Sequence, residues 1–109
     1  MFDELVTALK NISGVQFQEY GWKTRPDGNY GTVQIEFEPD SDNGDDAKQD
    51  RVFEGSVDLF TRGKEMMIVA AVETALESVC SGSWYLNSEQ HEHETGLIHR
   101  EFVFQIEKR

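Results

Sequence analysis

The sequence predicts an α+β domain, a two-layer sandwich in which two helices pack on one face of a mainly antiparallel sheet. Two segments carry apolar residues at helical spacing, and five segments alternate apolar and polar residues. Short turn sequences separate neighbouring strands, which favours antiparallel pairing. The predicted order is α-β-β-β-α-β-β. No linker or repeat interrupts the 109 residues, so we expect a single domain over residues 1–109.

Each predicted helix has an apolar stripe and a recognisable end. In the first helix the stripe consists of Phe2, Leu5, Val6, Leu9 and Ile12. Ser13-Gly14 follows it as a stop signal. The second helix covers residues 64–80, between Gly63 and Ser81-Gly82, and its wider stripe consists of Ile68, Val69, Val72, Ala75, Leu76 and Val79. Both stripes predict packing against a sheet.

The strands are predicted from alternation and from the turns between them. The expected strands cover residues 15–22, 30–38, 53–59, 84–94 and 97–108. The turn chemistry of residues 25–29 predicts a hairpin between the first two strands, and Pro39 ends the second. Thr95-Gly96 predicts a tight two-residue turn between the last two. Arg100 interrupts the apolar face of the last strand.

The net charge restricts the classes of partner. Ten Lys and Arg stand against 21 Asp and Glu, which gives −11. Such a surface repels phosphate, so we expect no direct nucleic-acid binding and no binding to an anionic membrane. The first residues do not form a signal peptide, and no apolar run is long enough to span a bilayer. Cys80 is the only cysteine, so no internal disulfide forms. We expect a protein made and kept inside a cell.

Residues 40–50 are the most acidic segment and the main candidate for partner contact. The candidate contacts are Asp40, Asp42, Asp45 and Asp46, together with Trp22 as an aromatic interface residue. The segment resembles a calcium loop in composition only. The EF-hand pattern needs Gly at its sixth position and Glu at its twelfth, where this chain has Asp45 and Arg51. We therefore expect an exposed loop that orders against a basic partner or stays solvated.

Three histidines near the last turn raise the question of a metal site. His91 and His93 point the same way on a strand, and a third ligand is needed. The two-residue turn places His91 opposite Arg100 and puts His99 on the other face, whereas a three-residue loop pairs His93 with His99. An ordinary polar strand is the favoured interpretation. Cys80 lies at a helix C-terminus, where the dipole disfavours a thiolate. We expect no catalytic residue, no cofactor and no metal.

Several stretches carry a resemblance that extends over nearly the whole chain. They are residues 19–26 (Glu-Tyr-Gly-Trp-Lys-Thr-Arg-Pro), 54–60, 84–88 and 94–99. In these the chain resembles small proteins encoded in the tail-morphogenesis regions of phages and prophages of Gram-positive bacteria. The element order is also similar to that of tail-terminator, or tail-completion, proteins of long-tailed phages. The resemblance implies a hexameric ring that caps the tail tube and docks to the head–tail connector. It implies no catalytic or cofactor-binding residue.

Three functional hypotheses follow. The first is a virion assembly protein, a tail terminator or head–tail joining subunit, present in the host bacterial cytoplasm and then in the virion tail. Its partners are its own copies, the tail tube and the connector. The second is an acidic module that blocks a basic host protein as a charge mimic. The third is a small metalloprotein that uses His91, His93 and His99.

Overall fold

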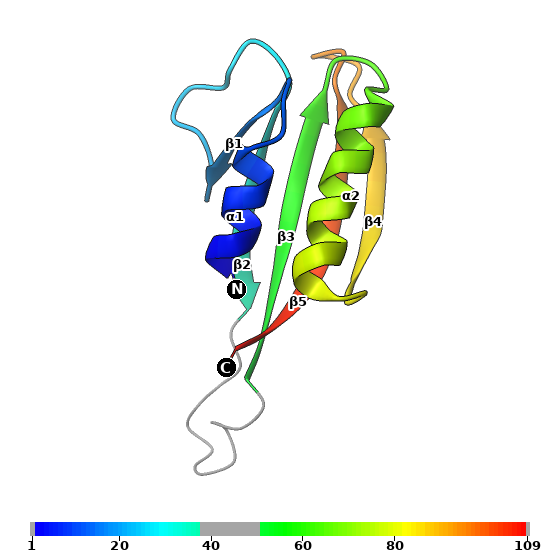
Figure 1. The fold of residues 1–109 in the computed structure, drawn as a ribbon. Coiled ribbons are helices and arrows are strands. Elements are labelled where there is room, and N and C mark those ends of the chain that lie inside the picture. The colour runs from blue at the N-terminus through cyan, green and yellow to red at the C-terminus, as the bar shows by residue number, and fades with distance from the viewer. Residues whose placement is uncertain (1, 38–50, 109) are drawn as a thin grey trace.

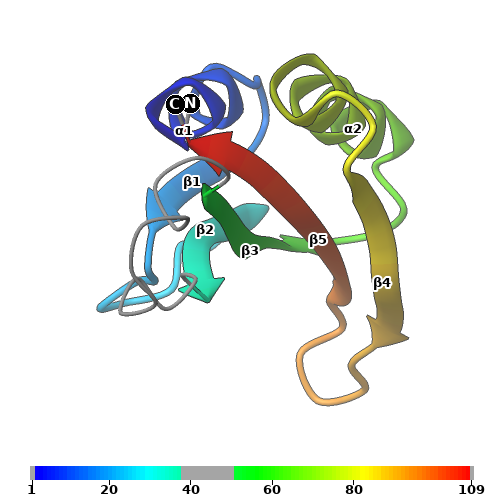
Figure 2. The same cartoon turned by 90° about the horizontal axis from the view of Figure 1, so that it is seen from below.

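The structure, a computed structural model, describes residues 2–37 and 51–108. Its elements are α1 (Phe2–Lys10), β1 (Gln16–Glu19), β2 (Tyr30–Phe37), β3 (Arg51–Thr61), α2 (Met66–Cys80), β4 (Trp84–His91) and β5 (Ile98–Lys108). Figures 1 and 2 show both helices on the same face of one sheet. The predicted α+β class, element order and layer arrangement are therefore confirmed.

α1 ends at Lys10, before the predicted stop at Ser13-Gly14, whereas α2 ends at Cys80 as predicted. α1 buries Leu5, Val6 and Leu9, and its two acidic residues lie in the first turn, where the helix dipole favours them. The C-cap of α2 is Ser81, which takes a left-handed conformation (φ 51°) and donates its backbone N–H to the Glu77 carbonyl at 3.1 Å. This bond satisfies one of the carbonyls left free at the helix end.

The strand order is β1-β2-β3-β5-β4, and the pairing of β1 corrects one prediction. β1 runs parallel to β2, with Gln16 opposite Tyr30, so the two strands do not form the expected hairpin. β1 also ends at Glu19, because Tyr20 (φ 65°) and Gly21 (φ 122°) turn the chain away from the sheet. The connection 20–29 then returns to the end where β1 began, and β2 starts there in the same direction (Figure 1).

The connection between β4 and β5 corrects a second prediction. β4 ends at His91, and residues 92–97 form a loop in which the Glu92 N–H donates to the Leu97 carbonyl at 2.9 Å. Glu92 in turn accepts the backbone N–H of Gly96 at 2.9 Å. The expected two-residue turn at Thr95-Gly96 is therefore wrong, and the register moves. Gln90 lies opposite His99, and neither predicted histidine pairing occurs.

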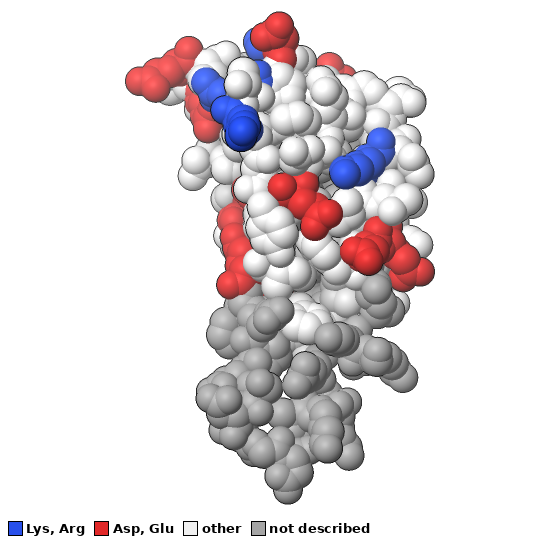
Figure 3. Space-filling view, turned by 90° about the vertical axis from the view of Figure 1, so that its left-hand side faces the viewer, with Lys and Arg blue, Asp and Glu red and all other residues white. Residues whose placement is uncertain are grey.

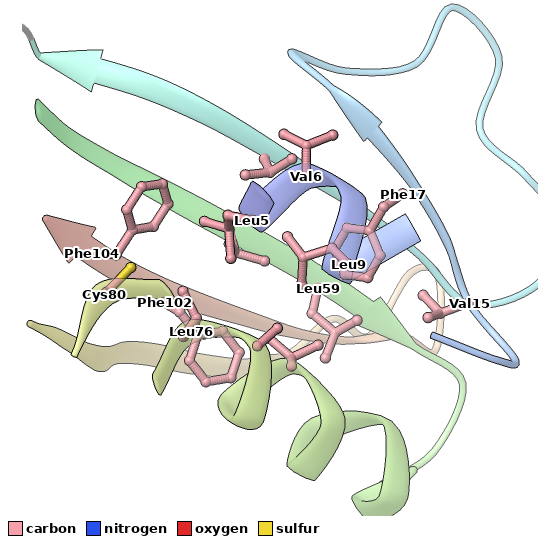
Figure 4. Packing of buried hydrophobic residues seen from close by; sticks show 14 of the residues in the cluster. Leu5, Val6, Leu9, Val15, Phe17, Leu59, Leu76, Cys80, Phe102 and Phe104 are labelled. Atoms are coloured by element: carbon pink, nitrogen blue, oxygen red, sulfur yellow. The ribbon is translucent and has the colours of Figure 1, made fainter. Parts of the chain in front are cut away.

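The core lies between the helices and the two central strands. Figure 4 shows Leu5 and Leu9 of α1 and Leu76 of α2 directed toward the apolar side of β3 and β5. Phe102 and Phe104 of β5 are among the largest fully buried side chains. A continuous cluster joins both helices to the sheet, so the helix stripes and the strand alternation were correctly assigned to one core.

Arg100 lies on this apolar face and is only 3% exposed. Its Nε donates to Glu89 Oε1 at 2.9 Å, and its Nη1 donates to Thr61 Oγ1 at 3.3 Å. A buried guanidinium needs such partners, because an unpaired charge in the interior costs several kcal/mol. The interruption noted in the sequence is thus a paired charge at the rim of the core.

Gly55 permits the closest approach in the sheet, and its substitution tests the packing. A Cβ there would lie 2.3 Å from the Gln34 carbonyl oxygen and 2.6 Å from Phe104 Cζ. We expect Gly55→Ala to lower the free energy of unfolding by about 1–3 kcal/mol, the usual cost of overpacking. Gly28→Ala is the matched control, because nothing lies within 4 Å of its Cβ position. Urea denaturation of both variants provides the measurement, and equal stabilities would contradict the packing described here.

Candidate functional site

Three connections meet at one end of the sheet and form the candidate site. They are residues 20–29, 62–65 and 92–97, which we call the loop end. Figure 1 shows the first climbing along the sheet edge to the end where the other two lie. Figure 2 shows the first and third on the side of the sheet away from the helices. α1 begins and β5 ends at the opposite end (Figure 1).

The loop end has a different charge from the rest of the chain. Its cations are Lys23, Arg25, Arg62 and Lys64, and its acidic residues are Asp27, Glu65, Glu92 and Glu94. These four cations and four carboxylates balance, so the remainder of the chain carries the whole net charge of −11. Figure 3 shows separated acidic and basic groups on the side nearest β1, not a continuous acidic surface. The loop end can therefore approach an acidic protein surface without net repulsion.

Large apolar side chains are exposed in three places. Beside the loop end they are Met66 and Met67, of which Met67 is 88% exposed. Tyr20 is exposed at the C-terminal end of β1. On the edge strand β4 they are Tyr85 and Leu86. Aromatic residues, Met and Arg are enriched in protein interfaces. The exposed Met side chains and the arginines at and beside the loop end are therefore of the types common at contact surfaces.

A pocket of about 300 Å³ lies within the loop end. It is lined by Arg25, Pro26, Asp27, Tyr30, Arg62, Thr95 and Leu97. Two local bonds position Arg62: its Nε donates to the Asp27 carbonyl at 2.7 Å, and its backbone N–H donates to Asn29 Oδ1 at 2.8 Å. The connection 20–29 and the end of β3 are thereby held together, and the pocket forms beside this junction.

The face of the sheet away from the helices, the outer face, carries a polar network. Gln34 donates from Nε2 to Asp58 Oδ2 at 3.0 Å and is also bonded to Ser56 Oγ. Ser56 in turn donates to Glu36 Oε2 at 3.1 Å. Asp58 also contacts His99, whose Nε2 lies 2.8 Å from its Oδ1. The network spans β2, β3 and β5 and fixes the positions of these side chains.

Three rings form a stack across the same strands. The Tyr30 and Phe60 centroids are 4.7 Å apart, and those of Phe60 and His99 are 4.2 Å apart, with both pairs nearly parallel. Tyr30 lies opposite Phe60 and Phe60 opposite His99 in the strand register. The stack therefore runs from the pocket, which Tyr30 lines, to the ion pair of His99 with Asp58.

The pKa of His99 is raised above its ordinary 6.5, mainly by the hydrogen bond to Asp58. Partial burial opposes this shift, while the negative charges of Asp58, Glu92 and Glu101 add to it. A raised pKa in the folded state means that folding favours the protonated imidazole. The resulting stabilisation is complete below pH 6.5 and is lost as the pH rises through the folded pKa.

The three histidines do not come together. His91 is exposed on the edge strand, His93 is exposed in the loop 92–97, and His99 faces Asp58 on the outer face. Within residues 2–37 and 51–108, no group of three or more His, Cys, Asp or Glu side chains is arranged to hold a metal. Cys80 is buried, and desolvation together with the nearby Glu77 raises the pKa of its thiol to about 11. It is thus a poor nucleophile, as its position predicts.

The predicted contact residues have different outcomes. Asp40, Asp42, Asp45 and Asp46 lie outside the described residues. Trp22 is half-buried, and its Nε1 donates to the Gly31 carbonyl at 3.0 Å, so its indole is attached to β2 of its own chain. Its role in a partner contact stays a prediction. The Trp22 bond also helps hold the connection 20–29 against the sheet.

The sequence pattern does not identify Arg25, Arg62 and Tyr30 as site residues. Arg25 lies in a predicted turn, and Tyr30 is the first residue of a predicted strand. One signal was present: four of the ten Lys and Arg fall in the predicted turns and helix-entry segments. What the sequence does not reveal is that these turns lie at the same end of the sheet.

No protein-family model and no curated protein matches the sequence. Among solved structures, the fold is similar to a chain in a structure described as "Virion of native gene transfer agent (GTA) particle". The likeness has a TM-score of 0.50 and 13% sequence identity, and it covers 94% of this chain and 82% of the other. At this identity the likeness concerns the fold. Within the described residues, no helix is long and apolar enough to cross a membrane.

The ion pair of His99 predicts a specific pH dependence. In Asp58→Asn the pKa of His99 should fall, because the hydrogen bond to a carboxylate is its main cause. The decrease in unfolding free energy above pH 6.5 should then become smaller. NMR titration of the imidazole signals measures the pKa, and denaturation at several pH values measures the stability.

His93, which is exposed in the loop 92–97, provides a reference imidazole signal for the assignment of His99. A His99 midpoint that does not change in Asp58→Asn would show that the carboxylate is not the cause of the shift.

Proposed function

We propose that this chain is a structural subunit of a phage-like virion that acts through protein contacts and carries out no catalysis. The observation that carries the proposal is the likeness of the fold to a chain of a gene transfer agent virion over 94% of this chain. The sequence resemblance to phage tail proteins is an independent support. More specifically, the subunit is a tail terminator or a head–tail joining protein that forms a ring.

A closed ring of identical subunits needs two different patches that fit each other. The loop end is one candidate patch, because it combines balanced charge with the exposed Met66 and Met67 side chains beside it. The edge strand β4 is the other. It pairs only with β5 among the described strands, and it exposes Tyr85 and Leu86. The register shift between Leu86 and Ser88 interrupts this edge, which favours side-chain contacts over simple strand addition.

The net charge sets a condition on assembly. Neighbouring subunits of charge −11 repel each other, and this repulsion weakens as salt screens it. A patch with balanced charge reduces the local repulsion at the contact. The ring should therefore be most stable at moderate or high ionic strength, or when a tail tube supplies additional contacts.

Light scattering coupled to size exclusion tests the proposal. With purified tail tubes present, we expect the 12.5 kDa chain to associate with the tube end as a ring of about six copies. Met67→Glu should weaken this association, because it places a charge in the loop end, whereas Glu73→Gln on α2 should leave it unchanged. A chain that stays monomeric and binds neither tail tubes nor connectors contradicts the proposal.

The acidic composition also supports a second candidate, a module that blocks a basic host protein. The same experiment separates the two functions if the variant Asp40→Asn, Asp42→Asn, Asp45→Asn, Asp46→Asn is included. A charge mimic loses its binding in this variant, while a ring subunit that contacts its neighbours through the loop end keeps its association with tubes.

A further inference from the structure

The pocket in the loop end contains unpaired hydrogen-bond donors. Arg25 and Arg62 both line it, and neither has a carboxylate within ion-pair distance among the described residues. Arg100 shows the contrast, because its guanidinium is paired with Glu89. The Nε of Arg62 is bound to the Asp27 carbonyl, which leaves its two terminal amino groups without a protein partner in the described chain. Two guanidinium groups therefore border one cavity with donors available.

Tyr30 adds a third donor that is almost completely buried. Its side chain is 4% exposed and its ring is held by the stack on Phe60. The hydroxyl has no hydrogen-bond partner among the described residues. Every fully enclosed side-chain oxygen and nitrogen in that part of the chain does have one. The hydroxyl therefore retains access to the exterior, and the pocket that Tyr30 lines provides it. A ligand or a water molecule in the pocket can therefore accept a hydrogen bond from this hydroxyl.

We infer that this pocket binds a carboxylate group. A guanidinium matches the two oxygens of a carboxylate in a bidentate arrangement, and the Tyr30 hydroxyl can donate one further bond. Asp27 also lines the pocket and reduces the charge of its two arginines to a single positive charge. This charge suits a singly charged carboxylate better than a doubly charged phosphate. A volume of about 300 Å³ is at the lower end for ligand pockets, which suits one acidic side chain.

A second copy of this chain supplies the carboxylate, and this part of the inference rests on the proposed ring. The chain has 21 acidic residues. Outside the loop end, 17 acidic residues are present together with six Lys and Arg. A head-to-tail contact would place the acidic remainder of one copy against the loop end of the next. One acidic side chain in the pocket would satisfy the two arginines and Tyr30, and it would fix the orientation of the neighbour.

Binding of a small carboxylate tests the pocket without any assembly. Butyrate, a singly charged carboxylate, is the probe, and ¹⁵N NMR follows the arginine Nε–H signals and the indole N–H of Trp22. We expect saturable shifts at Arg62, with affinity about tenfold weaker in Arg25→Gln/Arg62→Gln and a few-fold weaker in Tyr30→Phe. Tyr30→Phe keeps the ring that stacks on Phe60. Lys10→Gln on α1 is the matched control and should bind like the unmodified chain. Absence of saturable shifts overturns the inference, as does tighter binding of inorganic phosphate than of butyrate.

Assembly on tail tubes then tests the origin of the carboxylate. Arg25→Gln/Arg62→Gln should reduce ring formation at least tenfold, whereas Lys10→Gln should not. Butyrate binding without any assembly supports the pocket and rejects the ring. If the double variant assembles normally while the unmodified chain binds butyrate, the second copy is not the donor of the carboxylate, and the inference of a carboxylate pocket remains.

Discussion

The fold depends on burying the apolar side of the two central strands, β3 and β5. These strands pair along their full lengths, and their inward side chains, including Leu59, Phe102 and Phe104, are covered by both helices. Burial of such residues is the main favourable term in folding, roughly 1.5–3 kcal/mol for each large side chain. A small domain of this size has little other apolar area available. The apolar stripes of the helices and the apolar side of the central strands are therefore each buried only in the presence of the other.

Covering only one face leaves the other for polar chemistry. Glu36, Ser56, Asp58 and His99 bond to one another or to Gln34 across three strands, so the outer face is ordered although no helix lies on it. The stack of Tyr30, Phe60 and His99 links this network to the loop end. A rigid sheet thus positions the side chains of the connections, which is the usual way in which a scaffold supports a binding surface.

The uneven distribution of charge affects how copies of this chain can contact one another. A chain of net charge −11 would be poorly suited to contact copies of itself if its charge were uniform. Concentrating cations in the connections at one end produces a surface of balanced charge next to an acidic remainder. Such polarity is what the proposed ring would require, because each subunit of a ring presents two different patches.

The sequence by itself determined the α+β class, the order of elements, both helices with the C-terminal end of α2, and nearly all of the core. These follow from local periodicity and from turn chemistry, which act within a few residues. Only the tertiary structure decided the parallel pairing of β1, the six-residue loop before β5 and the burial of Arg100 beside Glu89. It alone brought Arg25, Tyr30 and Arg62 to one pocket. The physical reason is that backbone direction and strand register depend on contacts between residues distant in the chain. The connections that carry Arg25 and Arg62 have ordinary local sequences, and they share a site only because the sheet brings them to the same end.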